Sequence, residues 1–212
     1  MGMYIDKGNR KFAQALNSTY VDKSGLIAVI NRTLFTEQRR SCVTRSRRFG
    51  KSMAANMLCA YYDRSCDSRS LFENLEIAQD PTFEKYLNKF PVIKLDITDF
   101  VTQYKDDPGI IDKIQEALKA DVRKAYPDVV PDGFNGDFMG LLSLINEATG
   151  DSFIMVIDEW DTMCRESRDE TVVAYLNWMR RMFKSENALD VFAGVYMTGI
   201  LPIKRYSKQS AL

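Results

Sequence analysis

The residues best suited to chemistry are a lysine at a turn and a pair of acids at the end of an apolar run. Gly50-Lys51-Ser52 closes a turn between a predicted strand and a predicted helix. In a phosphate-binding loop, backbone N–H groups face the anion, the lysine reaches the terminal phosphates, and the serine hydroxyl binds magnesium. The tripeptide alone is unspecific, and its alternative is a helix N-terminus with a solvated lysine.

The acid pair is Asp158-Glu159, which follows the apolar run 153–157. A magnesium-dependent phosphate site needs one acid to hold the cation and one to orient the attacking water. We therefore assign Asp158, together with Ser52, to the metal and Glu159 to the water. Helix capping would also explain two acids here, but not their pairing with Gly-Lys-Ser. Together these motifs, of the Walker A and Walker B types, indicate a nucleotide site.

Three residues are assigned to catalysis: Lys51, Glu159 and Thr198. Thr198 ends a further apolar run, where its hydroxyl can sense the terminal phosphate or the attacking water; the alternative is a strand-end cap. The residues assigned to phosphate binding form the turn itself: Arg47, Arg48, Phe49, Gly50, Lys51 and Ser52. The usual pattern of such a loop begins with glycine, whereas this chain has Arg45 there.

Apolar periodicity predicts the elements that must position these residues. Apolar runs typical of buried strands alternate with amphipathic stretches typical of helices. The predicted strands are 41–44, 90–96, 153–157 and 191–197, and the predicted helices are 24–35, 51–62, 108–126, 137–149 and a segment around 172–183. The alternation predicts crossover units around a parallel sheet. Its strands end at Thr44, Asp96, Asp158 and Thr198, which should share one crevice because ligands bind beyond the carboxyl ends of parallel strands.

The predicted fold is α/β, a three-layered P-loop NTPase with a parallel sheet. The strand at 90–96 lies between the loop strand and the acidic strand in the sequence, so we expect these two not to be neighbours in the sheet. That arrangement, with Glu after Asp, is typical of the additional-strand, catalytic-glutamate division. We interpret residues 1–38 as an N-terminal helical lead-in segment and 39–212 as the ATPase core.

The core is expected to be truncated before its last strand. This fold usually has a fifth strand beside the loop strand, and little sequence follows Thr198. The loop strand should then be an exposed sheet edge, which favours self-association. We interpret the chain as the N-terminal part of a longer protein or as a truncated gene product.

Composition limits the chemistry. The chain has 212 residues, with 29 Lys and Arg against 29 Asp and Glu, and no histidine, so it has no net field and no imidazole base. Positive charge is nevertheless concentrated at Arg39, Arg40, Arg45, Arg47, Arg48 and Lys51. Triphosphate binding, a nucleic-acid surface and structurally paired arginines are the three open interpretations of this basic cluster.

Cysteine spacing and hydropathy predict the location. None of the four cysteines forms a C-x-x-C pair, which indicates reduced thiols and a cytoplasmic protein. No uninterrupted apolar run approaches the roughly 20 residues of a membrane helix, so no membrane partner is expected.

Five blocks carry a resemblance to a known family: 20–27 (Tyr-Val-Asp-Lys-Ser-Gly-Leu-Ile), 47–52, 90–93, 157–161 and 198–203 (Thr-Gly-Ile-Leu-Pro-Ile). In these blocks the chain resembles the predicted AAA-type ATPases of bacteria and archaea, which are often fused to a C-terminal nuclease-like domain of the PD-(D/E)XK superfamily. The resemblance implies that Arg45 in place of glycine is normal, although Ser46 stands where the family usually has proline. It also implies ATP and Mg²⁺ as ligands, with a nuclease-like domain or nucleic acid as candidate partners.

The function expected from these features is ATP binding with magnesium, followed by hydrolysis. The alternative is a non-hydrolysing nucleotide or nucleic-acid binding module that regulates a partner nuclease. Arginine fingers of such ATPases usually come from a neighbouring subunit, and Arg165 or Arg205 could serve. Asp96 and Asp161 are expected near the crevice in supporting positions.

Overall fold

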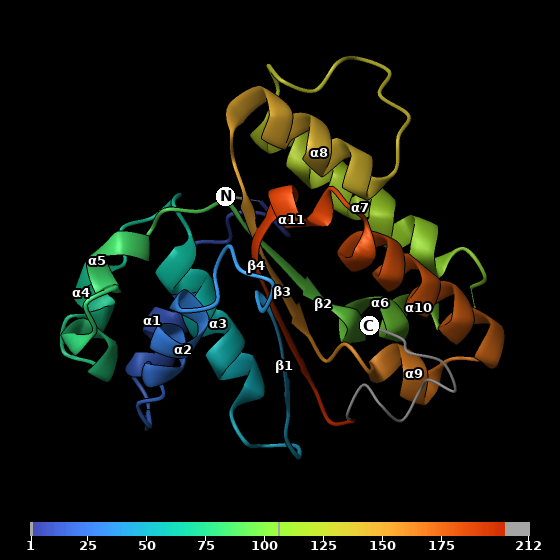
Figure 1. The fold of residues 1–212 in the computed structure, drawn as a ribbon. Helices are drawn as coiled ribbons and strands as arrows, with labels where there is room; N and C mark the ends of the chain where they lie inside the picture. Colours follow the sequence, from blue (N-terminus) through green and yellow to red (C-terminus); the bar gives the residue numbers. More distant parts are fainter. Residues whose placement is uncertain (1, 106, 202–212) are drawn as a thin grey trace.

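Groups of helices separate the strands along the chain, as Figure 1 shows for a computed structural model that describes residues 2–105 and 107–201. In chain order the elements are α1 (Arg10–Leu16), α2 (Gly25–Asn31), β1 (Arg40–Thr44), α3 (Lys51–Tyr62), α4 (Arg69–Phe72), the 3₁₀ helix η1 (Glu76–Gln79), α5 (Phe83–Tyr86), β2 (Val92–Asp96), α6 (Ile97–Tyr104), α7 (Ile110–Ala125), α8 (Phe138–Thr149), β3 (Phe153–Asp158), α9 (Thr162–Glu166), α10 (Asp169–Lys184), α11 (Ala188–Val191) and β4 (Phe192–Gly199).

The strands of the described residues form one parallel sheet in the order β1-β4-β3-β2. At its carboxyl edge, Asp158 of β3 is in register with Asp96 of β2, and Thr44 of β1 with Gly199 of β4. The strand ends predicted to share a crevice therefore lie along one edge of the sheet. This arrangement confirms the predicted α/β fold with a parallel sheet.

Helices cover both faces of the sheet and make three layers (Figure 1). Side chains of β3 alternate between the layers, because successive residues of a strand point to opposite faces. Ile154 and Val156 join the apolar cluster formed with α1 to α5, whereas Phe153, Met155 and Ile157 join the cluster formed with α6 to α11. β3 is buried along its whole length, as a central strand of a parallel sheet should be.

The strand order separates the loop strand from the acidic strand, as expected. β4 lies between β1 and β3, whereas β2, the strand that intervenes in the sequence, lies at the far edge. Within the described residues β1 has β4 as its only neighbour, so β1 is the expected sheet edge. The outer edge of β2 is covered by the N-terminal residues, where Ile5 bridges Ile93 and the Lys94 N–H donates to Tyr4 O at 2.7 Å.

Some elements differ from the prediction. The helix predicted at 24–35 ends at Asn31, and Phe35 has a left-handed φ of 60°, which a helix does not accommodate. Periodicity does not predict α6 or α9, because such short helices give too few turns for a pattern. α6 follows β2 directly, with Asp96 accepting a hydrogen bond from the Thr98 N–H as its N-cap.

The predicted lead-in segment contains α1 and α2, which pack against α3. Phe12 of α1 and Ile27 of α2 are fully buried in the same apolar cluster as α3. Within the described ranges, no helix has both the length and the apolar character needed to cross a membrane.

Candidate functional site

The turn between β1 and α3 has the backbone of an anion-binding loop. α3 begins at Lys51, as predicted, and Gly50 precedes it with a φ of 77°, a conformation in which glycine has no Cβ penalty. Arg48 is also left-handed, with a φ of 69°. The first N–H groups of a helix have no partner within the helix and carry its positive dipole end. These groups of α3 are therefore available to an anion at the turn.

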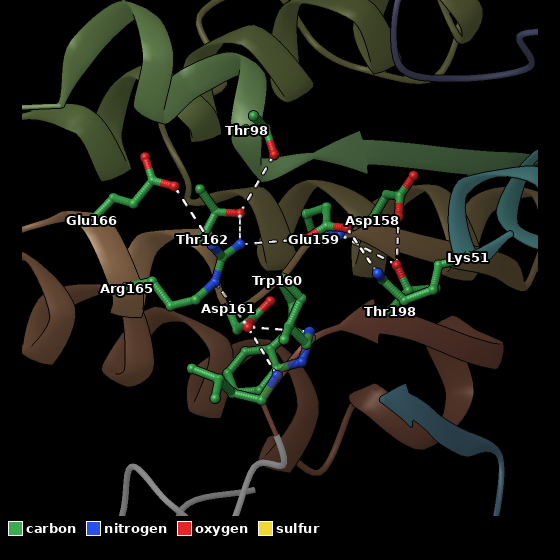
Figure 2. A network of polar contacts seen from close by, with 12 residues as sticks. Lys51, Thr98, Asp158, Glu159, Trp160, Asp161, Thr162, Arg165, Glu166 and Thr198 are labelled. Carbon is green, nitrogen blue, oxygen red and sulfur yellow. Dashed lines mark hydrogen bonds and ion pairs between the residues drawn. The ribbon is translucent and has the colours of Figure 1, made fainter. Parts of the chain in front are cut away.

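Lys51 contacts Glu159 of the acid pair, as Figure 2 shows. Its Nζ atom lies 3.2 Å from Glu159 Oε1 and donates a hydrogen bond to Ser46 O at 3.3 Å. Lys51 itself is only 7% exposed, so this ion pair is largely shielded from solvent. The structure thus brings together the lysine and the acid that the sequence assigns to one site.

Asp158 is the last residue of β3, and only one of its two carboxylate oxygens accepts a hydrogen bond from the described residues. The Thr198 hydroxyl donates a hydrogen bond to Asp158 Oδ1. Oδ2 is buried and has no hydrogen-bond partner among the described residues. A buried carboxylate oxygen without a donor is costly, and a bound cation would remove that cost. The unpartnered oxygen of Asp158 therefore fits a cation ligand, whereas Ser52, the second predicted ligand, belongs to the wall of a pocket that Asp158 does not line.

Asp96 adds negative charge at the same edge of the sheet. Burial raises the pKa of Asp96, and the charge of Asp158 on the neighbouring strand raises it further. Two carboxylates in register on neighbouring strands repel each other. A cation at this edge would relieve the repulsion, and the supporting role of Asp96 stays a prediction.

Thr198 lies on β4 beside the acid pair and is fully buried. In addition to its bond to Asp158, its oxygen accepts a hydrogen bond from the Glu159 N–H at 3.3 Å. Glu159 has a left-handed φ of 50°, so the chain turns sharply after β3 and carries the glutamate side chain towards Lys51. The hydroxyl of Thr198 is thus used in orienting both acids, and phosphate sensing by Thr198 stays a prediction.

Arg165 of α9 holds the other side of Glu159. Its Nη2 atom lies 3.3 Å from Glu159 Oε2, and its Nε atom lies 3.1 Å from Asp161 Oδ2 (Figure 2). Of the two arginine-finger candidates, the structure places Arg165 in the site of its own chain. Arg205 lies outside the described residues.

Asp161 ties the site to the end of β4. It is fully buried, and its Oδ2 atom accepts hydrogen bonds from the N–H groups of Ile200 and Leu201. At Gly199 an added Cβ would lie 2.6 Å from Trp160 Nε1 and 2.7 Å from Asp161 Oδ1. Only glycine leaves room for this close approach of β4 to Trp160 and Asp161.

A pocket of about 420 Å³ opens beside the acid pair, lined by Glu159 but not by Asp158 or Thr198. Its wall comes from the loop, the first turn of α3, α6 and α9: Arg47, Arg48, Gly50, Lys51, Ser52, Met53, Thr98, Glu159, Thr162, Arg165 and Glu166. Sequence reasoning missed Met53, Thr98, Thr162 and Glu166. A usable signal for the two threonines is their position just after Asp96 and Glu159 at the strand ends.

Phe49 has a different environment from the other loop residues. Its side chain is 61% exposed and does not form part of the pocket wall, so a phosphate contact at Phe49 would come from its backbone. Arg47, Arg48 and Ser52 are also exposed, but they line the pocket.

The basic cluster divides between the two ends of β1. Arg39 is buried, and its guanidinium donates to the carbonyl oxygens of Thr36, Leu189 and Phe192, while Arg40 donates to Phe183 O. These two arginines are structurally paired, as one of the three interpretations proposes. The remaining cations lie at the loop, so the six do not form one patch.

Parallel strands, helices on both faces and a glycine turn beside strand-end acids are compatible with a P-loop-like α/β protein. The sequence model of the predicted AAA-ATPase family matches residues 9–207. The chain belongs to this family, which confirms the resemblance. No curated protein matches the sequence.

Proposed function

We propose that the pocket binds ATP with Mg²⁺ and hydrolyses the terminal phosphate. One observation carries the proposal: Lys51 Nζ lies 3.2 Å from Glu159 Oε1 at the N-terminus of α3. A cation suited to phosphate and an acid suited to activating water thus meet in one pocket. The position of β4 between β1 and β3 supports the additional-strand, catalytic-glutamate subtype.

The metal would be held by Ser52 and Asp158. The support is the buried, unpartnered Oδ2 of Asp158 together with the Ser52 hydroxyl on the pocket wall. When bound, magnesium supplies charge neutralisation on the phosphate oxygens. Thr198 would keep Asp158 oriented through the hydrogen bond to Oδ1.

The reaction would run as an in-line displacement by water. The water oxygen bonds to the terminal phosphorus, Glu159 takes the proton, and the bond between that phosphorus and the bridging oxygen breaks to leave ADP and inorganic phosphate. Lys51 and the backbone N–H groups of 48–52 would stabilise the charge that develops on the phosphate oxygens. Lys51 must first leave Glu159 and Ser46, which frees the glutamate for the water.

A binding module without turnover is the second candidate function. The observation in its favour is that Glu159 is held by Lys51 on one side and by Arg165 on the other, so the base is not free. In this case nucleotide or nucleic acid would bind without hydrolysis and regulate a partner nuclease-like domain, with self-association through the β1 edge. If the ligand is a nucleic acid, the logarithm of its binding constant should fall linearly with the logarithm of the salt concentration. Chelation of magnesium should not produce this loss of affinity.

Phosphate release and ATP binding by three variants test the proposal. Lys51→Ala should abolish binding, because it removes the cation that meets the phosphates. Glu159→Gln should retain ATP but lose turnover by about 100-fold or more, because the amide cannot take the proton. Glu147→Gln, at an exposed position on α8, is the matched control and should behave as wild type.

The outcome separates the two functions. Release of phosphate by the wild type that is lost in Glu159→Gln and in the presence of chelator supports hydrolysis. Magnesium-dependent ATP binding without release supports the binding module. Equal loss of ATP affinity in Lys51→Ala and Glu159→Gln would contradict the roles assigned to both residues.

A further inference from the structure

Residues 20–24 belong to the block 20–27 that carries the family resemblance and have no role in the chemistry above, yet hydrogen bonds anchor them firmly. Asp22 Oδ1 accepts a hydrogen bond from the Ser24 N–H at 2.7 Å, and Oδ2 accepts one from the Glu76 N–H at 2.8 Å. Ser24 is fully buried, and its hydroxyl oxygen accepts from the Ile77 N–H at 3.1 Å. The segment is therefore fixed to η1 immediately before α2 begins.

Its middle residue, Lys23, reaches the loop that precedes α3. Lys23 Nζ donates a hydrogen bond to Phe49 O at 3.0 Å. A Cβ added at Gly50 would lie 3.0 Å from the same Nζ atom, so the ammonium group rests against the loop backbone. Lys23 does not belong to the pocket wall and is exposed. It thus approaches the loop from outside the pocket.

The conformation of the loop needs such support. Left-handed φ values at Arg48 and Gly50 flank a negative φ at Phe49. Alternation of handedness turns successive N–H groups to one side of the chain, which forms an anion-binding concavity. Gly50 adopts this conformation freely, but a residue with a Cβ such as Arg48 does not. A contact that holds a carbonyl oxygen on the outer side favours N–H groups that point inwards.

We infer that Lys23 is a positioning residue for the phosphate loop, which it holds through Phe49 O in the conformation that presents N–H groups to an anion. The inference rests on the proposed function only in taking the anion to be nucleotide phosphate. It gives the Asp-Lys-Ser part of the matching block a role: Asp22 and Ser24 fix the segment, and Lys23 holds the loop.

Lys23 and Lys51 have different roles at the loop. Lys51 Nζ donates to Ser46 O and pairs with Glu159, and it must leave both to reach a phosphate. Among the described residues, the one hydrogen-bond acceptor of Lys23 Nζ is Phe49 O, so Lys23 can keep this bond when the anion arrives. One lysine thus binds the ligand while the other keeps the loop in place.

The loop itself offers a test without nucleotide. Arg45, Arg47 and Arg48 are exposed, and trypsin cleavage after them reports how often the loop opens. In Lys23→Met, cleavage at these three sites should rise about fivefold, because the tie to Phe49 O is lost while opening remains a local event. The thermal midpoint should stay at the wild-type value, since Lys23 is exposed. Lys23→Arg should restore slow cleavage, and Lys11→Met, at an exposed position on α1, is the matched control.

ATP affinity is the second readout. Lys23→Met should weaken ATP binding about tenfold, equivalent to ~1.4 kcal/mol, and Lys23→Arg should recover most of it. Unchanged cleavage in Lys23→Met, or unchanged ATP affinity where the wild type binds, would overturn the inference. Faster loop cleavage in a protein whose wild type binds no ATP would leave the role of Lys23 standing and overturn the proposed function instead.

Discussion

The hydroxyl of Thr198 donates a hydrogen bond to Asp158 Oδ1 and accepts one from the Glu159 N–H at 3.3 Å. One side chain on β4 therefore orients the carboxylate that ends β3 and the backbone of the acid that follows. Both Thr198 and Asp158 are buried, so water does not replace either bond. Thr198 thus connects the stability of the sheet to the geometry of the acid pair.

Replacement of Thr198 by valine should destabilise the fold. The shape is conserved, but Asp158 Oδ1 and the Glu159 N–H lose their partner in a buried site, which costs about 1–3 kcal/mol for an unsatisfied group. Urea unfolding would measure the loss. Thr198→Ser retains the hydroxyl and should recover most of the stability. Equal stability of the valine and serine variants would show that the hydroxyl is not needed.

Arg165→Met should impair turnover more than ATP binding. The guanidinium lines the pocket and pairs with both Glu159 and Asp161, so its removal takes away an oriented positive charge where charge develops. We expect hydrolysis to fall about tenfold or more, with a smaller change in ATP affinity. Steady-state phosphate release and ATP titration measure the two quantities. Arg10→Met, at an exposed position on α1, is the control, and wild-type turnover in Arg165→Met would contradict the role.

Replacement of Arg39 should destabilise the fold, whereas replacement of Arg47 should weaken ATP binding. Arg39→Met removes the guanidinium that donates to Leu189 O and Phe192 O, while Thr36 O keeps its hydrogen bond from the Arg39 N–H, and should cost about 1–3 kcal/mol in the free energy of unfolding. Arg47→Met changes an exposed residue of the pocket rim and should alter stability by no more than about 0.5 kcal/mol while weakening ATP binding. Urea unfolding and ATP titration of both variants would test the division of the basic cluster. Similar effects of the two substitutions would refute it.

Asp6 should make stability depend on pH. Burial, the largest cause, and the nearby charge of Asp63 raise the pKa of Asp6 to about 6, although the hydrogen bond from the Val92 N–H acts in the opposite direction. The folded state therefore holds this proton more tightly than the unfolded state, whose ordinary value is 3.8. The resulting stability is greatest at low pH and is lost as pH rises through about 6.

The Asp6→Asn variant isolates that contribution, because an amide oxygen still accepts from the Val92 N–H but does not titrate. Relative to this variant, the wild type should gain about 1 kcal/mol of unfolding free energy between pH 7 and pH 5. Urea unfolding of both proteins at the two pH values measures the difference. Parallel pH profiles for wild type and variant would show that Asp6 titrates with its ordinary pKa.

The sequence predicts the parts of the site that depend on local pattern. A β-run, a glycine turn and an amphipathic helix place Lys51 at the first position of α3, and a fully apolar run places Asp158 at the end of β3. These predictions hold because periodicity and turn chemistry act over a few residues. The same rules do not predict short helices such as α9. They therefore do not place Thr162 and Arg165, which lie on that helix.

Strand order and side-chain partners were decided only by the tertiary structure. That β4 separates β1 from β3, that Thr198 serves Asp158, and that Lys23 reaches Phe49 O all depend on which segments pack side by side. Arg39 and Arg47 belong to one basic cluster in the sequence, yet they lie at opposite ends of β1 in the structure. Local propensity sets the backbone of each element, whereas the partner of a buried polar group follows from sheet order and register, which depend on contacts between distant parts of the chain.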